Sequence, residues 1–169
     1  MKHLYLLRHA KSSWDEPAVA DFNRPLNARG LETAPFMGEL MAERAIRPDL
    51  IISSPAKRAL ETALLVKEAS GTDSPLRVDE RVYEASPLTL RTVISQVSDE
   101  ISSVLLVGHN PGMEGLVRHL TGEVQTMPTA SLAFVTLNID SWRAADTGTG
   151  ILNFLLRPKE EMKRAGGAQ

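Results

Sequence analysis

Two histidines in the chain each follow a short apolar run, at the point where a β-strand is expected to end. His9 comes directly after Arg8, behind the run of residues 3–7, and His109 lies one glycine beyond a second run, residues 103–107. Open α/β sheets bind ligands beyond the carboxyl ends of their parallel strands. An imidazole beside a guanidinium group at such an edge suits an anionic substrate and a nucleophile or base.

A second arginine, Arg58, is predicted to lie in the first turn of a helix that follows a strand at residues 49–53. Ser54 and Pro55 are typical of a helix start, with a capping hydroxyl and a proline at the first helical position. The unpaired N–H groups and the positive dipole end of such a turn already favour an anion. Arg58 should therefore add its charge to the same crevice.

Tyr83 and Glu84 end a third predicted strand and its extension, residues 76–83, and so reach the same edge. Two arginines, two histidines and a carboxylate suit phosphoryl transfer, because guanidinium groups neutralise phosphoryl oxygens while an uncharged imidazole attacks phosphorus in line. The carboxylic acid, Glu84, would protonate the leaving oxygen.

The elements that must position these residues alternate along the chain. Apolar runs predict strands at residues 3–7, 49–53, 76–83, 103–107, 129–139 and 150–157, with helices between the first five. This order predicts an α/β protein, a three-layer α/β/α sandwich whose mainly parallel sheet has an antiparallel edge from the closing pair of strands. Asn27 is the expected cap of the first helix, where Pro35 predicts a kink or a late start.

Length and composition indicate one soluble domain over residues 1–157, followed by a polar C-terminal tail, residues 158–169, that we expect to be frayed. The net charge of -2 argues against bulk binding of nucleic acid or of a membrane surface, since both need a basic excess. Without an apolar segment of membrane-spanning length or a leader pattern, the expected location is cytoplasmic.

The types of residue present also limit the cofactors. There is no cysteine, which excludes disulfides, thiol catalysis and thiolate metal sites. The four histidines form no HxxxH or HxH pair, so no metal site is predicted, and no other cofactor is expected.

Four motifs in register carry a resemblance to a known family. They are RHA at residues 8–10, DFNRPLNARG at 21–30, SSPAKRALETA at 53–63 and VGHNPG at 107–112. Over residues 3 to about 157 the chain resembles the histidine phosphatase superfamily, also called the phosphoglycerate mutase-like or RHG family. The RHAKSSW segment that starts at Arg8 and the short overall length are most similar to the SixA-like phosphohistidine phosphatase branch.

The resemblance implies a role for each matching residue. His9 would be the nucleophile that becomes transiently phosphorylated. Arg8, Arg58 and His109 would form the phosphate pocket, with His109 protonated and polarising a phosphoryl oxygen, and Arg24 would border the same pocket. Residue 10 is alanine where many relatives have glycine, which indicates a less demanding backbone conformation there.

The general acid is the least defined of these roles. Glu84 falls where relatives with such an acid keep theirs, but the branch often works without one, and Asp15, Glu16 or Asp21 on the first loop could serve instead. Phosphohistidine has a readily protonated imidazole as its leaving group, whereas a phosphomonoester needs the proton more. The identity of the acid therefore depends on the substrate.

Three more residues of the first loop have two interpretations each. Lys11 and Ser12 could bind substrate through backbone N–H groups and the hydroxyl, or could simply belong to a polar loop. Trp14 could contact a protein partner at the rim of the pocket or could cover the edge of the core.

The favoured function is that of a protein phosphohistidine phosphatase. Only about twenty residues separate Glu84 from Val104, which is too few for the helical insertion that roofs the pocket in many relatives. An open pocket can admit a side chain of another protein, and water there favours hydrolysis over the transfer that a mutase performs. A small-molecule phosphomonoesterase and a non-catalytic phosphate-binding module are the alternatives.

Overall fold

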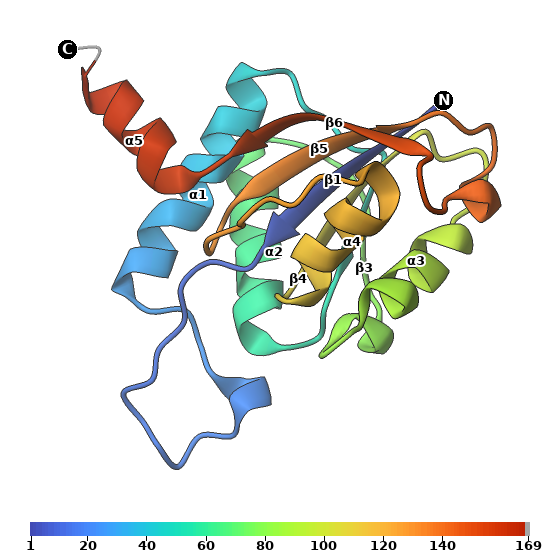
Figure 1. The fold of residues 1–169 in the computed structure, drawn as a ribbon. Helices are drawn as coiled ribbons and strands as arrows, with labels where there is room; N and C mark the ends of the chain where they lie inside the picture. The colour runs from blue at the N-terminus through green and yellow to red at the C-terminus, as the bar shows by residue number, and fades with distance from the viewer. Residues whose placement is uncertain (168–169) are drawn as a thin grey trace.

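A six-stranded sheet forms the centre of the protein, and helices cover both of its faces (Figure 1). The computed structural model describes residues 1–167. The strand order is β3-β2-β4-β1-β5-β6, in which the first four strands are mutually parallel and β5 is antiparallel to both of its neighbours. The strands are β1 Lys2–Arg8, β2 Leu50–Ser53, β3 Leu76–Val78, β4 Ser103–Gly108, β5 Leu132–Leu137 and β6 Gly150–Leu156. This arrangement confirms the predicted fold class, including the antiparallel edge.

Five α-helices accompany the sheet, and single 3-10 turns lie at Asp21–Asn23, Glu80–Val82 and Trp142–Ala144. The helices are α1 Ala28–Glu43, α2 Lys57–Ser70, α3 Pro87–Ser95, α4 Gly112–Thr121 and α5 Pro158–Gly167. Helices α1 and α2 pack on one face of the sheet, and α3 and α4 pack on the other.

The first strand shows why these strands are continuous apolar runs. Leu4 and Leu6 of β1 pack in the core beneath α3 and α4, whereas Tyr5 and Leu7 pack in the core beneath α1 and α2. Because helices cover both faces, the four consecutive residues Leu4 to Leu7 are all buried, and each such side chain contributes about 1.5–3 kcal/mol of apolar burial.

The predicted cap of helix α1 is confirmed, and helix α3 has a cap of the same kind. The Asn27 side chain accepts a hydrogen bond of 2.9 Å from the backbone N–H of Gly30, and the Ser86 hydroxyl accepts one of 3.2 Å from Thr89. Helix α1 begins at Ala28 and continues through Pro35, so the late start that we considered for this helix is wrong.

Two predicted element boundaries are wrong. Helix α2 begins at Lys57 rather than at Pro55, and Ser54 does not cap it, because the Ser54 hydroxyl bonds to the imidazole of His109 (2.7 Å) as well as to the backbone N–H two residues on. Strand β3 ends at Val78 instead of residue 83, because Asp79 caps the 3-10 turn that follows.

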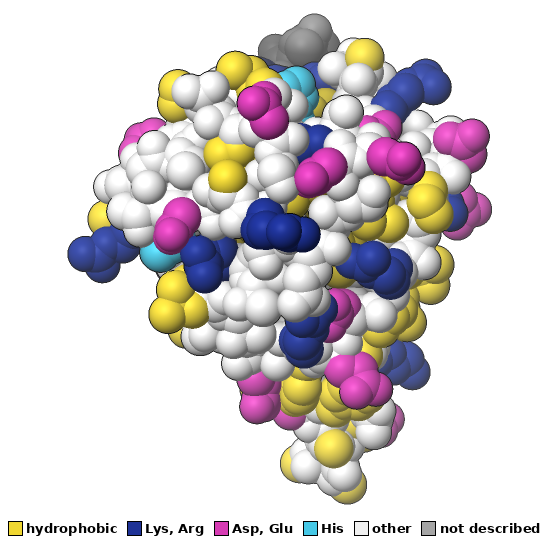
Figure 2. Space-filling model, turned by 90° about the vertical axis from the view of Figure 1, so that its right-hand side faces the viewer, with side chains coloured by type: hydrophobic (Ala, Val, Ile, Leu, Met, Phe, Trp, Pro, Cys, Tyr) yellow, Lys and Arg dark blue, Asp and Glu magenta, His cyan; other side chains and the backbone are white. Residues whose placement is uncertain are grey.

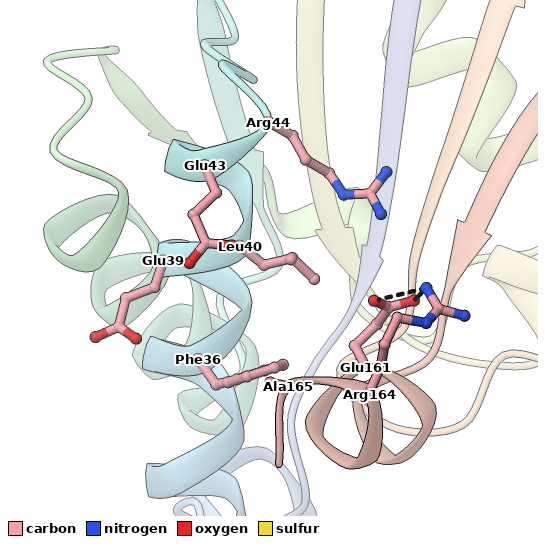
Figure 3. A pocket seen from close by; sticks show the side chains of 8 residues that line it. All are labelled: Phe36, Glu39, Leu40, Glu43, Arg44, Glu161, Arg164 and Ala165. Carbon is pink, nitrogen blue, oxygen red and sulfur yellow. Dashed lines mark hydrogen bonds and ion pairs between the residues drawn. The ribbon is translucent and has the colours of Figure 1, made fainter. Parts of the chain in front are cut away.

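The C-terminal residues 158–167 form helix α5, so the expected fraying is wrong for them, and residues 168–169 lie outside the described part of the chain. A groove of about 520 Å³ lies between α1 and α5. Phe36 and Leu40 point into it from α1, and Glu161 of α5 pairs with Arg164 at 3.0 Å (Figure 3). No residue predicted to act in the site lines this groove. The division at residue 157 into a domain and a tail stays a prediction.

The surface carries charges of both signs. On the face shown in Figure 2, cations and carboxylates are interspersed, and hydrophobic side chains gather at the lower tip, where Figure 1 places the loop between β1 and α1. Within residues 1–167, the helices are all too short or too polar to cross a membrane. The cytoplasmic location stays a prediction.

The contact between Gly30 and Lys11 provides a test of this fold. A β-carbon added at Gly30 would lie 2.2 Å from the Lys11 carbonyl oxygen, which also accepts a hydrogen bond of 3.0 Å from the backbone of Asn27. We expect Gly30→Ala to lower the free energy of unfolding by about 1–3 kcal/mol, since backbone has to move to relieve the clash. Urea denaturation measures this change. Gly166→Ala, where no described atom outside its own turn lies within 4 Å, is the control, and equal effects of the two substitutions would contradict the prediction.

Candidate active site

The register of the parallel strands brings the two histidines to one edge of the sheet. Arg8 at the end of β1 lies opposite Gly108 at the end of β4, so that His9 and His109 leave the sheet at the same level. Their ring centroids are 5.1 Å apart. Strand β2 lies on the other side of β4 and ends there too, at Ser53. The predicted convergence of the strand ends is therefore what the structure shows.

His9 is held in one defined tautomer. Its Nδ1 lies 2.7 Å from the carbonyl oxygen of Ala10, and because a carbonyl only accepts, Nδ1 must carry the proton. In the neutral ring the lone pair is then on Nε2. His9 is 7% exposed, and burial, together with the positive charges of Arg58 and Arg8, lowers the pKa of His9 to about 3. The imidazole is therefore neutral at pH 7, as a nucleophile must be.

The carbonyl that orients His9 is itself held by helix α2. The backbone N–H of Ala10 donates to Thr62 Oγ1 at 3.0 Å, and that hydroxyl donates to the carbonyl of Arg58 at 2.7 Å. Ala10 is fully buried, and its φ lies outside the positive range that favours glycine, as the alanine at this position predicts. Thr62 was missed in the sequence, since nothing in its local pattern marks this long-range contact.

Arg8 and Arg58 both keep a buried N–H group without an acceptor in the described chain. Arg58 is 6% exposed and donates to the carbonyl and the carboxylate of Asp21, at 2.8 and 3.1 Å. Arg8 donates through Nη1 to the carbonyl of Met127 at 2.9 Å. The Nε atom of each arginine is buried and unpaired among the described residues. Such donors are expensive to bury unless an acceptor, such as a phosphoryl oxygen, reaches them.

His109 is a third residue of the site with a buried polar atom that lacks a partner among the described residues. Its Nε2 lies 2.7 Å from the Ser54 hydroxyl, and its buried Nδ1 has no partner among the described residues. Burial, followed by the charge of Arg58, lowers the pKa of His109 to about 4, so the ring is neutral at pH 7. The protonated form that the resemblance implies for His109 beside a phosphoryl oxygen stays a prediction. A phosphate dianion beside the ring would favour that charged form.

These groups line one pocket of about 320 Å³. The predicted site residues that line it are Arg8, His9, Lys11, Ser12, Arg24, Arg58 and His109. Asn110 and Thr129 also line the pocket and were missed as site residues, because Asn110 reads as part of a turn and Thr129 as the start of a strand. Asn110 donates to the same Met127 carbonyl that Arg8 contacts, at 3.0 Å.

The side chain of Asp21 joins the first loop to this pocket. Its carboxylate accepts hydrogen bonds from Arg24 (3.0 Å), Arg58 (3.1 Å) and the hydroxyl of Tyr83 (2.6 Å). The bond from Tyr83, with those from the two arginines, lowers the pKa of Asp21 to about 2, and the same bond raises the pKa of Tyr83 to about 12. Asp21 is thus ionised at pH 7 and has no proton to give to a leaving group in this arrangement.

The other candidates for the general acid lie outside the pocket. Glu84 is exposed, with a φ of +54°, and lines a neighbouring hollow of about 560 Å³ that shares Arg58 and His109 with the pocket. Asp15 and Glu16 line a different hollow of about 360 Å³ in the first loop. Of these carboxylates, Glu84 alone borders a cavity that adjoins both His109 and Arg58.

Trp14 stands at the rim of the pocket and does not cover the core. It is 75% exposed, and its ring lies 3.5 Å from the guanidinium carbon of Arg24. Arg24 is buried, and it also donates to the hydroxyl of Ser12 at 2.6 Å. The first loop therefore presents an exposed aromatic ring stacked on a buried arginine, and contact of Trp14 with a protein partner stays a prediction.

Within residues 1–167, no three His, Cys, Asp or Glu side chains are placed together so that they could hold a metal ion. That no cofactor is needed stays a prediction.

The sequence matches a known family along its N-terminal half. A profile of the histidine phosphatase superfamily (branch 1) matches residues 4–93. An uncharacterized protein of Mycobacterium tuberculosis is 36% identical over 110 residues, which cover 65% of this chain and 66% of that protein. This chain thus spans about two thirds of the length of that relative.

Solved structures match the whole fold. A protein of Agrobacterium tumefaciens, described as a candidate phosphohistidine phosphatase SixA, has a TM-score of 0.81 and 33% identity over 93% of this chain and 98% of its own. The protein histidine phosphatase SixA complexed with tungstate has a TM-score of 0.82 and 23% identity over 94% of this chain and 99% of its own, a likeness of fold. These matches confirm the family resemblance predicted from the four motifs.

The neutral state of both imidazoles can be tested by nuclear magnetic resonance. Since burial and the guanidinium charges disfavour the imidazolium, the ring signals of His9 and His109 should titrate below pH 5, not near 6.5. Tungstate should move the midpoint of His109 upward, because the anion favours the charged ring. His9→Gln and His109→Gln assign the signals, and a midpoint near 6.5 for either ring without tungstate would contradict the assignment of neutral rings.

Proposed function

Because the chain belongs to the histidine phosphatase superfamily, we propose that it is a phosphatase that acts through a covalent phosphohistidine on His9, with phosphohistidine in a protein as its substrate. One observation carries the proposal. The buried, neutral ring of His9 has its Nδ1 proton fixed by Ala10, which leaves the lone pair on Nε2, and the same pocket is lined by Arg8 and Arg58, each with an unpaired N–H group.

The proposed reaction has two steps. In the first, Nε2 of His9 attacks phosphorus, the bond between phosphorus and the substrate nitrogen breaks, and the leaving imidazole takes up a proton. In the second, water attacks the same phosphorus, the bond to His9 breaks, and inorganic phosphate leaves. The guanidinium groups of Arg8 and Arg58 neutralise the equatorial oxygens in both steps, and His109 hydrogen-bonds to one of them.

The openness of the pocket supports a substrate displayed on another protein. Between Glu84 and β4 the chain forms α3, a helix of nine residues, and no further helix. Trp14 is exposed at the rim, where a partner can contact it. Among the solved structures with this fold is one described as a protein histidine phosphatase. Water reaches an open pocket, which favours hydrolysis over the phosphoryl transfer of a mutase.

A small phosphomonoester is the second candidate substrate. The hollow of about 560 Å³ beside the pocket is lined by Ala85, Pro87 and Pro111, and Glu84 stands at its edge. An apolar leaving group could occupy this hollow while Glu84 protonates its oxygen. A phosphate-binding module without turnover has less support, because binding alone does not need a buried nucleophile in a fixed tautomer.

The proposed intermediate can be trapped with a radiolabelled aryl phosphate and rapid denaturation in alkali. Wild-type protein should carry label that is stable in alkali and lost in acid, as expected for a phosphoramidate. His9→Ala should lose the label and reduce turnover on the order of a thousand-fold or more, as removal of a nucleophile does. His119→Ala, which removes an imidazole from α4, is the control. If wild-type protein binds tungstate but shows neither label nor turnover, the protein is a binding module.

The two substrate classes differ in their need for Glu84. We expect Glu84→Gln to slow hydrolysis of an aryl phosphate by about ten- to a hundred-fold, because an alkoxide or phenoxide leaving group needs the proton. Hydrolysis of a phosphohistidine peptide should change by less than about threefold, since imidazole leaves more readily. Glu80→Gln, an exposed neighbour in the preceding 3-10 turn, is the control. Equal losses on both substrates would contradict the argument that only the phosphomonoester needs a proton from Glu84.

A further inference from the structure

A second hollow adjoins the proposed catalytic pocket and does not include Glu84 in its lining. Its volume is about 460 Å³, and it shares Lys11 and Thr129 with the pocket. The rest of its wall comes from Pro128, from the first turns of α1 at Arg29 and Thr33, and from the junction of β6 with α5. Three segments that are distant in sequence therefore meet around it.

The lining of this hollow is strongly basic. Its charged residues are the cations Lys11, Arg29, Arg157 and Lys159, and the single carboxylate Glu160. Arg157 lies 3.9 Å from Glu160, and Arg29 lies 3.4 Å from Glu32, which is outside the lining. Lys11 and Lys159 are exposed, and within residues 1–167 neither forms an ion pair. A protein with a net charge of -2 thus concentrates cations beside its catalytic pocket.

The wall between the two cavities is fixed by backbone contacts. The Lys11 carbonyl accepts a hydrogen bond of 3.0 Å from Asn27, and Gly30 of α1 packs directly against it. On the opposite wall, Arg157 donates to the carbonyl of Thr126 at 3.0 and 3.2 Å. These contacts hold the backbone of Lys11 and the guanidinium group of Arg157 in place before any ligand arrives, which limits the loss of entropy on binding.

We propose that this basic hollow binds acidic side chains that flank the phosphorylated residue of a protein substrate. The inference rests on the proposed function and specifies its partner. The shared residues Lys11 and Thr129 make the hollow continuous with the pocket. An extended chain advances about 3.3–3.6 Å per residue, so residues two or three positions from a phosphohistidine in the pocket can reach the neighbouring cavity. Its charge complements carboxylates, and it would repel a basic segment.

We expect the basic hollow to affect which protein segments bind and how readily they associate with the protein. Each exposed ion pair is weak, but several cations around one concave surface raise the local concentration of an acidic segment. Salt screens such interactions over about 8–10 Å near physiological ionic strength. The hollow should therefore affect kcat/KM for acidic protein segments, and it should not affect a small phosphate that occupies the pocket alone.

The experiment compares two synthetic peptides that carry one histidine phosphorylated with phosphoramidate, flanked on both sides by Glu in one peptide and by Gln in the other. Wild-type protein should show about tenfold higher kcat/KM on the Glu peptide, and 0.5 M NaCl should reduce that preference. The double variant Arg29→Glu/Lys159→Glu should lose the preference and hydrolyse p-nitrophenyl phosphate within twofold of wild type. The double variant Arg143→Glu/Lys163→Glu, with the same change in net charge at exposed sites outside the hollow, should keep the preference.

Other results would overturn the inference. Equal kcat/KM on the two peptides in wild-type protein, or equal losses in the two double variants, would show that the basic hollow does not select substrates. Label on His9 in the same protein would still support the proposed function. If the Arg29→Glu/Lys159→Glu variant slows a small bisphosphate but neither peptide, the hollow binds a second anion of a small molecule. Absence of any label on wild-type protein would refute the proposed function and this inference with it. If the double variant does not fold, as judged by circular dichroism, Lys159→Glu alone replaces it in the same comparison.

Discussion

The register between β1 and β4 is the constraint on which the rest of the site depends. With Arg8 opposite Gly108, the residues that follow are two histidines at one level of the sheet. Side chains alternate along a strand, so a slip of one residue would exchange the two faces of β1 and bury different residues in both cores. Because helices cover both faces, the packing of the core opposes such a slip along the whole strand, and the same packing stabilises the geometry of the pocket.

The charges around the pocket keep the imidazole rings of His9 and His109 neutral and leave N–H groups of the arginines free to bind an anion. Burial and the guanidinium groups both disfavour a protonated imidazole at His9 and at His109. A carboxylate inside the pocket would repel a phosphate, and the one carboxylate that pairs with Arg58, Asp21, approaches from the first loop, which it ties to Arg24 and Tyr83. The arginines are thereby held in place, and their remaining donors suit an anion.

The sequence predicts the parts of this molecule that depend on local pattern. Apolar runs predict the strands, and residues at strand ends share an edge whatever their partners are. Long-range contacts account for the failures, since no local signal shows that Ser54 bonds to His109 instead of starting α2. For the same reason, the sequence does not predict the tautomer of His9 or the hydrogen bond between Asp21 and Arg58. Both depend on contacts that only the structure shows. The tail at residues 158–167 is polar enough to suggest fraying, yet it forms a helix that buries Glu161.

The two hollows beside the pocket separate the choice of substrate from the chemistry. The hollow at Glu84 is mostly apolar and shares Arg58 and His109 with the pocket, whereas the basic hollow shares Lys11. A leaving group and a flanking chain segment can therefore be recognised on different sides of one phosphoryl group. The proposed nucleophile, His9, and the two arginines need not change for either side to change, since different elements line each hollow. Differences in substrate among proteins with this fold can then arise from residues that never touch phosphorus, as expected where function depends on sites added to a shared scaffold.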